Sequence, residues 1–370
     1  MKNKALLLGA FSACLVVGLA ATKSDVTPSV NESWNQKAAA SYLDQREGWW
    51  LTWPRAQRDH GTACVSCHTA VPYALARPVL RGVLGETSIS APEQGMLANI
   101  TKRVSLWNEM EPFYSDAKSG PGKSVESRNA ESVLNALILA QYDAARGKSS
   151  EVAHKAFDNM WALQSKTEGP VGAWVWQNFH LAPWEGDQSE YWGATVAALA
   201  TATEPDHYSA DPKIQANLNL LRQYLVKNFD AQPVYNKLIL LWTSTKLPGL
   251  LTPEKRAALE DTLYGMQQAD GGWSMTPMGP WTRKDNTPEE TRSDGLATGL
   301  TVFALEEAGV PRSQEQVKKG LEWLLKNQDP ANGSWVAYSV NKKRDLSSDA
   351  GRFMSDSATS FAVLALETER

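Results

Sequence analysis

Three stretches in the second half of the chain repeat one arrangement of apolar and polar positions. In each, apolar residues recur at helical spacing, the stretch ends in Gln, and a polar turn then leads to Gly and Trp. This periodicity predicts an amphipathic helix that buries one face. The three copies span residues 157–174, 263–273 and 321–335.

A second, more apolar stretch follows each copy after about twenty residues and is rich in Ala, Gly, Thr and aliphatic side chains. A helix that is apolar on most sides is buried on most sides, so each unit is interpreted as one outer and one inner helix. These inner helices are predicted over 191–203, 294–308 and 356–367, and three weaker pairs over 36–45 with 64–80, 93–110 with 126–144, and 214–229 with 234–245. Six pairs can close into a ring, so the sequence predicts an all-α fold, an α6/α6 toroid.

The Gln…Gly-x-Trp units resemble the repeats of squalene and hopene cyclases, oxidosqualene cyclases and protein prenyltransferase β-subunits. The resemblance covers most of residues 150–370 and implies a toroid whose central cavity accepts apolar chains. It does not imply the chemistry of those families, because the chain lacks the Asp-x-Asp-Asp signature of the protonating cyclases. A prenyltransferase zinc site would also need a cysteine, and the two cysteines outside the N-terminal segment belong to another motif. Function therefore has to be argued from the site.

That motif is Cys64-Val65-Ser66-Cys67-His68, which has the spacing of covalent haem attachment. The two thiols bond to the haem vinyl groups and the histidine coordinates the iron. Zinc would need two more ligands at close spacing, and no second Cys pair exists. The sequence therefore predicts one covalent haem c, with Cys64 and Cys67 as attachment residues and His68 as the proximal iron ligand.

The first repeat, at about 35–85, carries this motif. Aligned with the later repeats, it places the motif on the first turns of an inner helix, with the haem at the mouth of the cavity. The chain starts with Lys2 and Lys4 before an apolar run over 5–20, which predicts a signal peptide at 1–21 and one domain at 22–370. Export, most simply to the periplasm, follows from this pattern, and a lipid anchor on Cys14 is a weaker alternative.

The composition of the chain excludes some classes of binding partner. With 42% hydrophobic and 21% charged residues the chain is globular, and its net charge of −4 offers no basic surface for nucleic acid. No apolar run after the signal peptide is long enough to span a bilayer. The expected partners are an unidentified redox protein and an apolar small molecule in the cavity.

The loops 175–189, 274–292 and 336–354 are expected to gather at one end of the ring beside the haem. They contain His180, Met278 and Met354, together with several Trp residues. Met278 or His180 is predicted as a distal iron ligand, with an open site as the alternative.

Acidic residues form a second set of candidate functional or helix-capping residues. Asp294 and Asp356 are interpreted as helix N-caps. Glu131 is expected to face the cavity as a catalytic, proton-relaying carboxylate, with Arg128 as its local partner.

Two function classes remain, and a third is weaker. The favoured one is a haem-dependent oxidoreductase that acts on an organic, apolar substrate. The alternative is an electron-transfer cytochrome that uses the toroid as a scaffold. A polysaccharide-binding or polysaccharide-cleaving toroid comes last, because it leaves the haem motif unexplained.

Overall fold

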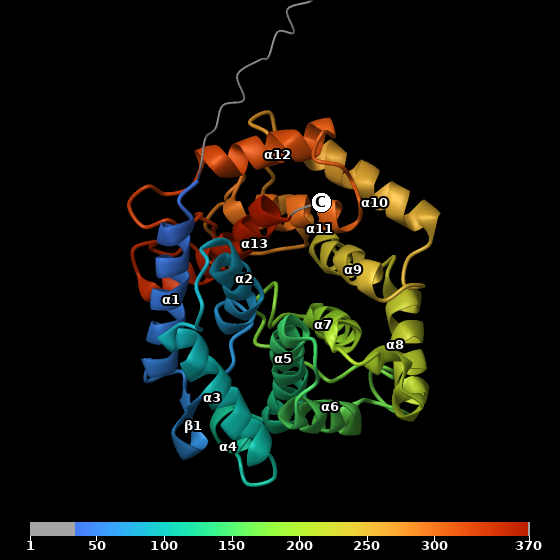
Figure 1. Ribbon diagram of the computed structural model, residues 1–370. Coiled ribbons are helices and arrows are strands. Elements are labelled where there is room, and N and C mark those ends of the chain that lie inside the picture. The colour runs from blue at the N-terminus through green and yellow to red at the C-terminus, as the bar shows by residue number, and fades with distance from the viewer. Residues whose placement is uncertain (1–33, 369–370) are drawn as a thin grey trace, which may run out of the picture. The chain divides into compact units, whose positions relative to one another are not determined.

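Alternating outer and inner helices form a ring in the computed structural model, which describes residues 34–368 (Figure 1). The predicted signal peptide at 1–21 and Cys14 lie outside the described residues. The outer helices are α1 (Gln36–Thr52), α3 (Ala91–Ser105), α6 (Glu151–Leu163), α8 (Gln215–Asn228), α10 (Pro253–Met266) and α12 (Glu315–Lys326). The inner helices are α2 (Ala70–Val83), α5 (Lys123–Arg146), α7 (Ser189–Thr203), α9 (Val234–Lys246), α11 (Gly295–Glu307) and α13 (Phe353–Glu367). The predicted all-α toroid of six helix pairs is confirmed.

The remaining elements are short. One further helix, α4 (Asp116–Ser119), precedes α5, and an antiparallel hairpin joins β1 (Gln57–Arg58) to β2 (Thr62–Ala63). The 3-10 turns are η1 (Asp59–Gly61), η2 (Tyr208–Ala210), η3 (Pro212–Ile214), η4 (Thr276–Met278) and η5 (Asp349–Arg352). No helix of residues 34–368 is long and apolar enough to cross a membrane.

The inner helices close the ring by contact with their neighbours. In chain order α2 packs on α5, α5 on α7, α7 on α9, α9 on α11 and α11 on α13, and α13 returns to α2. Every residue of α11 from Gly295 to Glu306 is buried, which explains why this helix is apolar on all sides. Threonine hydroxyls on the inner helices bond back to carbonyls four residues earlier, as Thr195 does to Tyr191. This bond lets a threonine be buried inside the ring with its hydroxyl paired, although Oγ1 of Thr301 on α11 has no hydrogen-bond partner among the described residues.

The repeated Gln ties each unit to the outer helix of another. The side-chain Nε2 of Gln164 donates to the carbonyl of Gly172, in its own turn, and to that of Asn217 on α8, both at 2.9 Å. The equivalent bonds join Gln267 to Gly271 and Gln316, and Gln328 to Gly333 and Asn35. The last of these reaches the residue that caps α1 and therefore closes the ring of outer helices.

The repeated Gly and Trp hold each turn against its neighbours. Trp174 is fully buried, and its indole Nε1 donates to the carbonyl of Met160 at 2.7 Å. Gly172 has φ +95°, and a Cβ there would lie 2.2 Å from the carbonyl oxygen of Leu220 on α8. Only glycine fits this combination of left-handed backbone and close approach. The matching indole bonds run from Trp273 to Leu263 and from Trp335 to Leu324.

The first unit departs from the predicted pattern. Helix α1 continues to Thr52, so Gly48-Trp49-Trp50 lies in its last turns and forms no Gly-Trp turn. Helix α2 begins at Ala70, and the motif of residues 64–68 occupies the extended segment and turn before it. The hairpin of β1 and β2 directly precedes the motif and keeps the backbone extended up to that turn.

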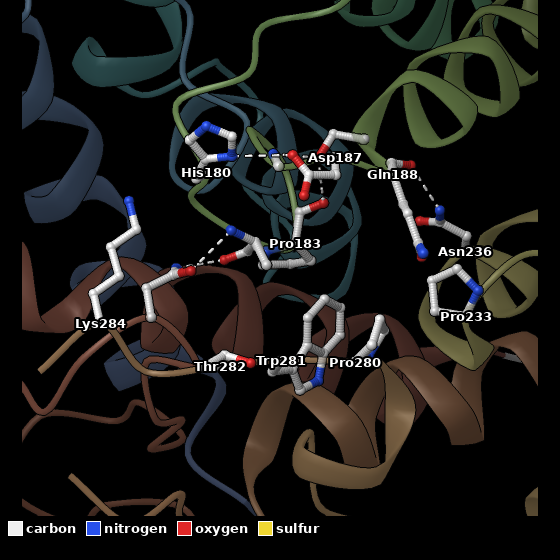
Figure 2. Close-up of a pocket in the computed structure, with 14 residues that line it drawn as sticks. His180, Pro183, Asp187, Gln188, Pro233, Asn236, Pro280, Trp281, Thr282 and Lys284 are labelled. Carbon is white, nitrogen blue, oxygen red and sulfur yellow. Dashed lines mark hydrogen bonds and ion pairs between the residues drawn. The ribbon is translucent and has the colours of Figure 1, made fainter. Parts of the chain in front are cut away.

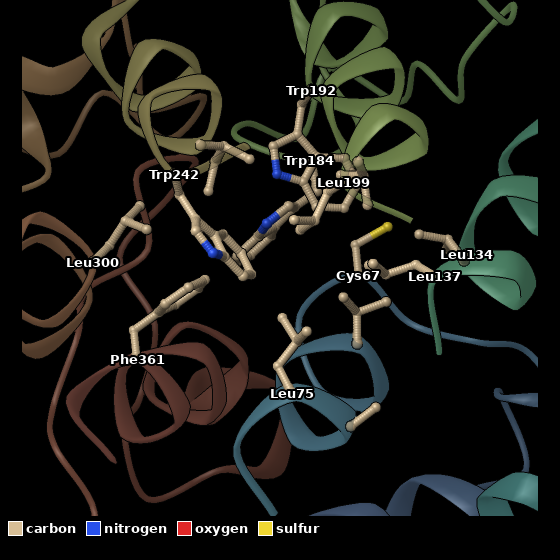
Figure 3. Packing of buried hydrophobic residues seen from close by; sticks show 14 of the residues in the cluster. Cys67, Leu75, Leu134, Leu137, Trp184, Trp192, Leu199, Trp242, Leu300 and Phe361 are labelled. Carbon is tan, nitrogen blue, oxygen red and sulfur yellow. The ribbon is translucent and has the colours of Figure 1, made fainter. Parts of the chain in front are cut away.

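Side chains fill much of the centre of the ring, as Figure 3 shows for Trp242, Leu75 and Phe361. The apolar cavity that remains among them has a volume of about 20 Å³, far below the range of about 300–1,000 Å³ that is typical of ligand pockets. The wide central cavity implied by the resemblance is therefore not present in this part of the ring.

Candidate functional site

The motif lies where the inner helices begin, on the wall of a pocket with about 960 Å³ of space between atoms, part of it open to solvent. Loops 175–189 and 336–354 contribute to this wall, as the sequence predicts. We call it the motif pocket; its lining residues are Trp50, Trp53, Cys64, Val65, Ser66, Cys67, His68, Tyr114, Gln177, Leu181, Ala182, Trp184, Glu185, Ser339, Asn341, Arg344, Ala350, Gly351, Phe353 and Met354.

The two thiols of the motif are buried and unoxidised. Cys64 and Cys67 form no disulfide and are 8% and 6% exposed. Burial raises the pKa of Cys64 to about 12 and that of Cys67 well above its usual value, so both are thiols at neutral pH. The indole Nε1 of Trp50 donates to the carbonyl of Cys64 at 2.6 Å and fixes this end of the motif.

His68 is held between aromatic rings. Its imidazole stacks on Phe353 with 3.9 Å between ring centroids, and the edge of Trp50 meets it at 5.0 Å. The ring atom Nδ1 lies 2.9 Å from Oγ1 of Thr69. Burial, helped by nearby arginines, lowers the pKa of His68 to about 3, so the imidazole is neutral and one ring nitrogen keeps a lone pair.

Two ionisable side chains of the pocket, Arg344 and Glu185, form no side-chain hydrogen bond or ion pair within residues 34–368. Arg344 is half-buried and makes no hydrogen bond or ion pair with any residue of the described chain, and burial lowers its pKa. The carboxyl of Glu185 likewise has no side-chain bond within residues 34–368, and burial raises its pKa to about 7. The guanidinium of Arg344 is therefore available at the pocket wall for a ligand that carries a negative charge.

The structure separates the two predicted distal ligands from the motif. Met278 is fully buried and does not line the motif pocket. His180 lies in a neighbouring pocket, where its Nδ1 pairs with Asp187 at 3.0 Å and its side chain is 70% exposed. Met354 does line the motif pocket. The role of Met278 or His180 as distal ligand stays a prediction.

Glu131 forms an ion pair with an arginine that the sequence analysis did not predict as its partner. Arg103 on α3 donates Nε to Oε1 of Glu131 at 2.5 Å and Nη2 to Oε2 at 3.1 Å, and both side chains are 0% exposed. Arg128, the predicted partner, is farther away at 3.7 Å. Glu131 lines neither the motif pocket nor its neighbour, so its placement favours a structural ion pair.

Asp356 is also placed differently from its prediction. Helix α13 begins at Phe353, so Asp356 lies inside the first turn and caps nothing. It accepts instead from Arg46, Tyr42 and Thr69. The capping role of Asp294 is confirmed, because its side chain accepts from the backbone N–H groups of the first turn of α11. Nothing in the local sequence around Asp356 indicates partners about 300 residues away.

The neighbouring pocket includes part of the third predicted loop and has about 930 Å³ of space between atoms, part of it open to solvent (Figure 2). We call it the Trp281 pocket, and it shares Ala182 and Asn341 with the motif pocket. Its wall combines prolines and one indole with amide, hydroxyl and charged groups: His180, Pro183, Asp187, Gln188, Ser189, Pro233, Asn236, Pro280, Trp281, Thr282 and Lys284.

Comparisons with known proteins bear on the fold. No family model matches the chain, and a search of curated proteins finds no match. Similar solved structures include a wild-type glycosidase, at TM-score 0.50 and 13% identity over 89% of this chain and 97% of that one. A structure described as a glycosidase variant gives TM-score 0.50 and 12% identity with the same coverage. An inactive α-1,6-mannanase of Salegentibacter sp. HEL1_6, in complex with α-1,6-mannotriose, gives TM-score 0.47 and 13% identity over 89% of this chain and all of that one.

At this identity the likeness shows the fold alone, and it agrees with an α/α toroid. The two structures at TM-score 0.50 are glycosidases, a finding that contradicts the function predicted from the sequence. Neither the haem-dependent oxidoreductase with an apolar substrate nor the electron-transfer cytochrome is carried further. Among residues 34–368 no three His, Cys, Asp or Glu side chains form a cluster that could hold a metal ion by themselves.

Proposed function

We propose that the motif pocket binds one haem c, held by thioether bonds to Cys64 and Cys67 and with His68 as an iron ligand. The observation that carries this proposal is that all three side chains line one pocket. The proposal concerns binding and assigns no redox reaction. It includes export through the predicted signal peptide, because c-type haem is normally attached after the chain has crossed a membrane.

The chemistry of the pocket wall fits this group. Indole and phenyl faces of Trp50, Trp53, Trp184 and Phe353 provide apolar walls for a flat macrocycle. Haem also carries two carboxylates, and the unpaired guanidinium of Arg344 is the group on this wall that suits them. When bound, the haem would supply an iron that the imidazole of His68 could ligate.

The first test is expression of the full chain together with a haem c attachment system, followed by mass measurement of the denatured protein. We expect one haem to remain on the denatured wild-type chain. The double variant Cys64→Ala/Cys67→Ala should lose it, whereas the control His180→Ala should retain it. A denatured wild-type chain without haem mass would overturn the proposal.

A second candidate function is carbohydrate binding in the Trp281 pocket, which the glycosidase names of the similar structures also suggest. The support is the wall chemistry: the indole of Trp281 is fixed by a bond from its Nε1 to the carbonyl of Met275, and the carboxamide of Asn236 is oriented by Gln188. A flat aromatic face beside amide groups suits the C–H face and hydroxyls of a sugar.

Cleavage is less well supported than binding. Glycoside hydrolysis generally uses two carboxylates that flank the bond. Asp187 is the one carboxylate among the residues that line this pocket. Titration calorimetry with α-1,6-mannotriose, on the wild type and on Trp281→Ala, tests the idea. Heat that is lost in the variant would support it, and no heat with the wild type would refute it for this sugar.

A further inference from the structure

We propose that Thr69 and Asp356 hold His68 in the single tautomer that leaves the lone pair of Nε2 free for an iron. This inference adds a detail to the proposed haem site and depends on that proposed function for its biological meaning. Neither residue belongs to the attachment motif, and Asp356 comes from the opposite end of the chain. Both are positioning residues, because they act on the iron ligand and not on the haem.

Arg46 determines the protonation state of Asp356, because its guanidinium has only hydrogen-bond donors. Its Nε donates to Oδ1 of Asp356 at 2.7 Å, and its Nη2 donates to Oδ2 at 3.0 Å. The hydroxyl of Tyr42 donates to Oδ1 at 2.9 Å. A two-point bond to an always-charged arginine identifies this group as a carboxylate, which only accepts hydrogen bonds.

The hydroxyl of Thr69 must therefore donate to Asp356. Its Oγ1 lies 2.7 Å from Oδ2, and a hydroxyl has one hydrogen to give. Toward His68 the same oxygen can then only accept, and it lies 2.9 Å from Nδ1. The hydrogen of the neutral ring is therefore on Nδ1, and Nε2 carries the lone pair. A histidine that binds a metal generally has its other nitrogen oriented in this way by a second group.

Burial protects this chain of hydrogen bonds from water; we call it the tautomer relay, and it runs from Asp356 through Thr69 to His68. Asp356 is 1% exposed and Thr69 is 2% exposed, so water does not compete for these bonds. The next residue of α13, Ser357, donates its hydroxyl to the backbone carbonyl of His68 at 3.0 Å. One turn of α13 thus fixes both the backbone and, through Thr69, the ring of the proposed ligand.

The decisive experiment needs no haem. In the Cys64→Ala/Cys67→Ala background, ¹⁵N-labelled histidine rings report by NMR which nitrogen carries the hydrogen. We expect the His68 ring to be the Nδ1–H tautomer. Thr69→Val, which keeps the shape but removes the hydroxyl, should shift the ring toward a mixture or the Nε2–H form. Thr69→Ser should restore the original signal, and the His180 ring serves as an internal control.

A parent protein with His68 in the Nε2–H form, or a Thr69→Val variant with an unchanged tautomer, would overturn the inference. Near-ultraviolet circular dichroism would reveal a folding defect in Thr69→Val. In that case the tautomer of His68 is measured by the same NMR experiment in Asp356→Asn. In the haem-loaded protein, Thr69→Val should change the midpoint potential and the paramagnetic-resonance spectrum, and Thr69→Ser should leave both near wild type. A chain that shows the predicted tautomer but binds no haem would refute the proposed function and leave the tautomer relay intact.

Discussion

Replacing Glu131 by Gln should lower stability and leave the motif pocket unchanged. The carboxylate of Glu131 pairs with Arg103 through two bonds, and neither side chain is exposed to solvent. Removing one partner of a buried ion pair leaves an uncompensated charge and costs about 3–5 kcal/mol. The remaining contacts of Arg103 soften this cost, since it also donates to Thr62 and to the carbonyl of Glu111.

The cost converts into a measurable shift in melting temperature. At about 2.1 cal/mol/K per residue, the 335 residues from 34 to 368 have an unfolding entropy of about 0.7 kcal/mol/K. A loss of about 3–5 kcal/mol therefore lowers Tm by roughly 4–7 °C, which differential scanning calorimetry resolves easily. The double variant Arg103→Met/Glu131→Leu removes both charges and should recover most of the loss.

The reasoning would be refuted by a Glu131→Gln variant that melts within about 1 °C of the wild type. A variant of normal stability whose haem spectrum depends on pH differently from that of the wild type would also refute it, because that difference would restore the proton-relay role predicted from the sequence. A double variant that is less stable than Glu131→Gln alone would show that the pair is net stabilising in this context.

Three further outcomes can be checked. Burial without hydrogen-bond partners raises the pKa of Glu47 from 4.5 to about 8, so the native state keeps a proton that the unfolded state loses, and stability falls as pH rises between those values. Relative to the wild type, Glu47→Gln should gain up to about 1.4 kcal/mol per pH unit between pH 5 and 8, as urea unfolding would show. Gly333→Ala would place a Cβ 2.4 Å from the carbonyl carbon of Ala38 at φ +80° and should lower Tm by several degrees, whereas Gly82→Ala, with open space around it, should keep or slightly raise Tm. Arg344→Met should weaken haem retention in a chain whose attachment cysteines are replaced, as a spectroscopic titration with free haem would show.

Periodicity was sufficient to predict all six helix pairs, because the outer helices bury one face and the inner helices bury nearly all of theirs. The boundaries of the first unit were wrong for a local reason. Gly48-Trp49-Trp50 resembles the Gly-Trp turn of later units, yet α1 continues through it. In those units the glycine after the repeated Gln packs against another outer helix at positive φ, as Gly172 does. Gly48 is helical, and a Cβ added to it would meet only the ring of Pro92 at ordinary contact distance.

The candidate site, like the fold, was predicted only in part. The motif residues could be predicted because their chemistry depends on neighbours in sequence, and the structure keeps all three on one pocket wall. The relay behind His68 could not, since Asp356 and Arg46 are joined only when the last inner helix returns to the first unit. Arg103 was missed because it is 28 residues from Glu131 on another helix, while Arg128 is close in sequence.

Because hydrogen bonds close the ring, any of the six helix pairs could in principle come first in the sequence. Asn35 and Gln328 exchange two hydrogen bonds, and Gln36 donates to Glu367 at 2.6 Å, so the two ends of the described chain are neighbours. A short linker between them, with a new opening at the exposed residues Asp206 and His207 between α7 and α8, would give a circular permutant in which the same six pairs are synthesised in a different order.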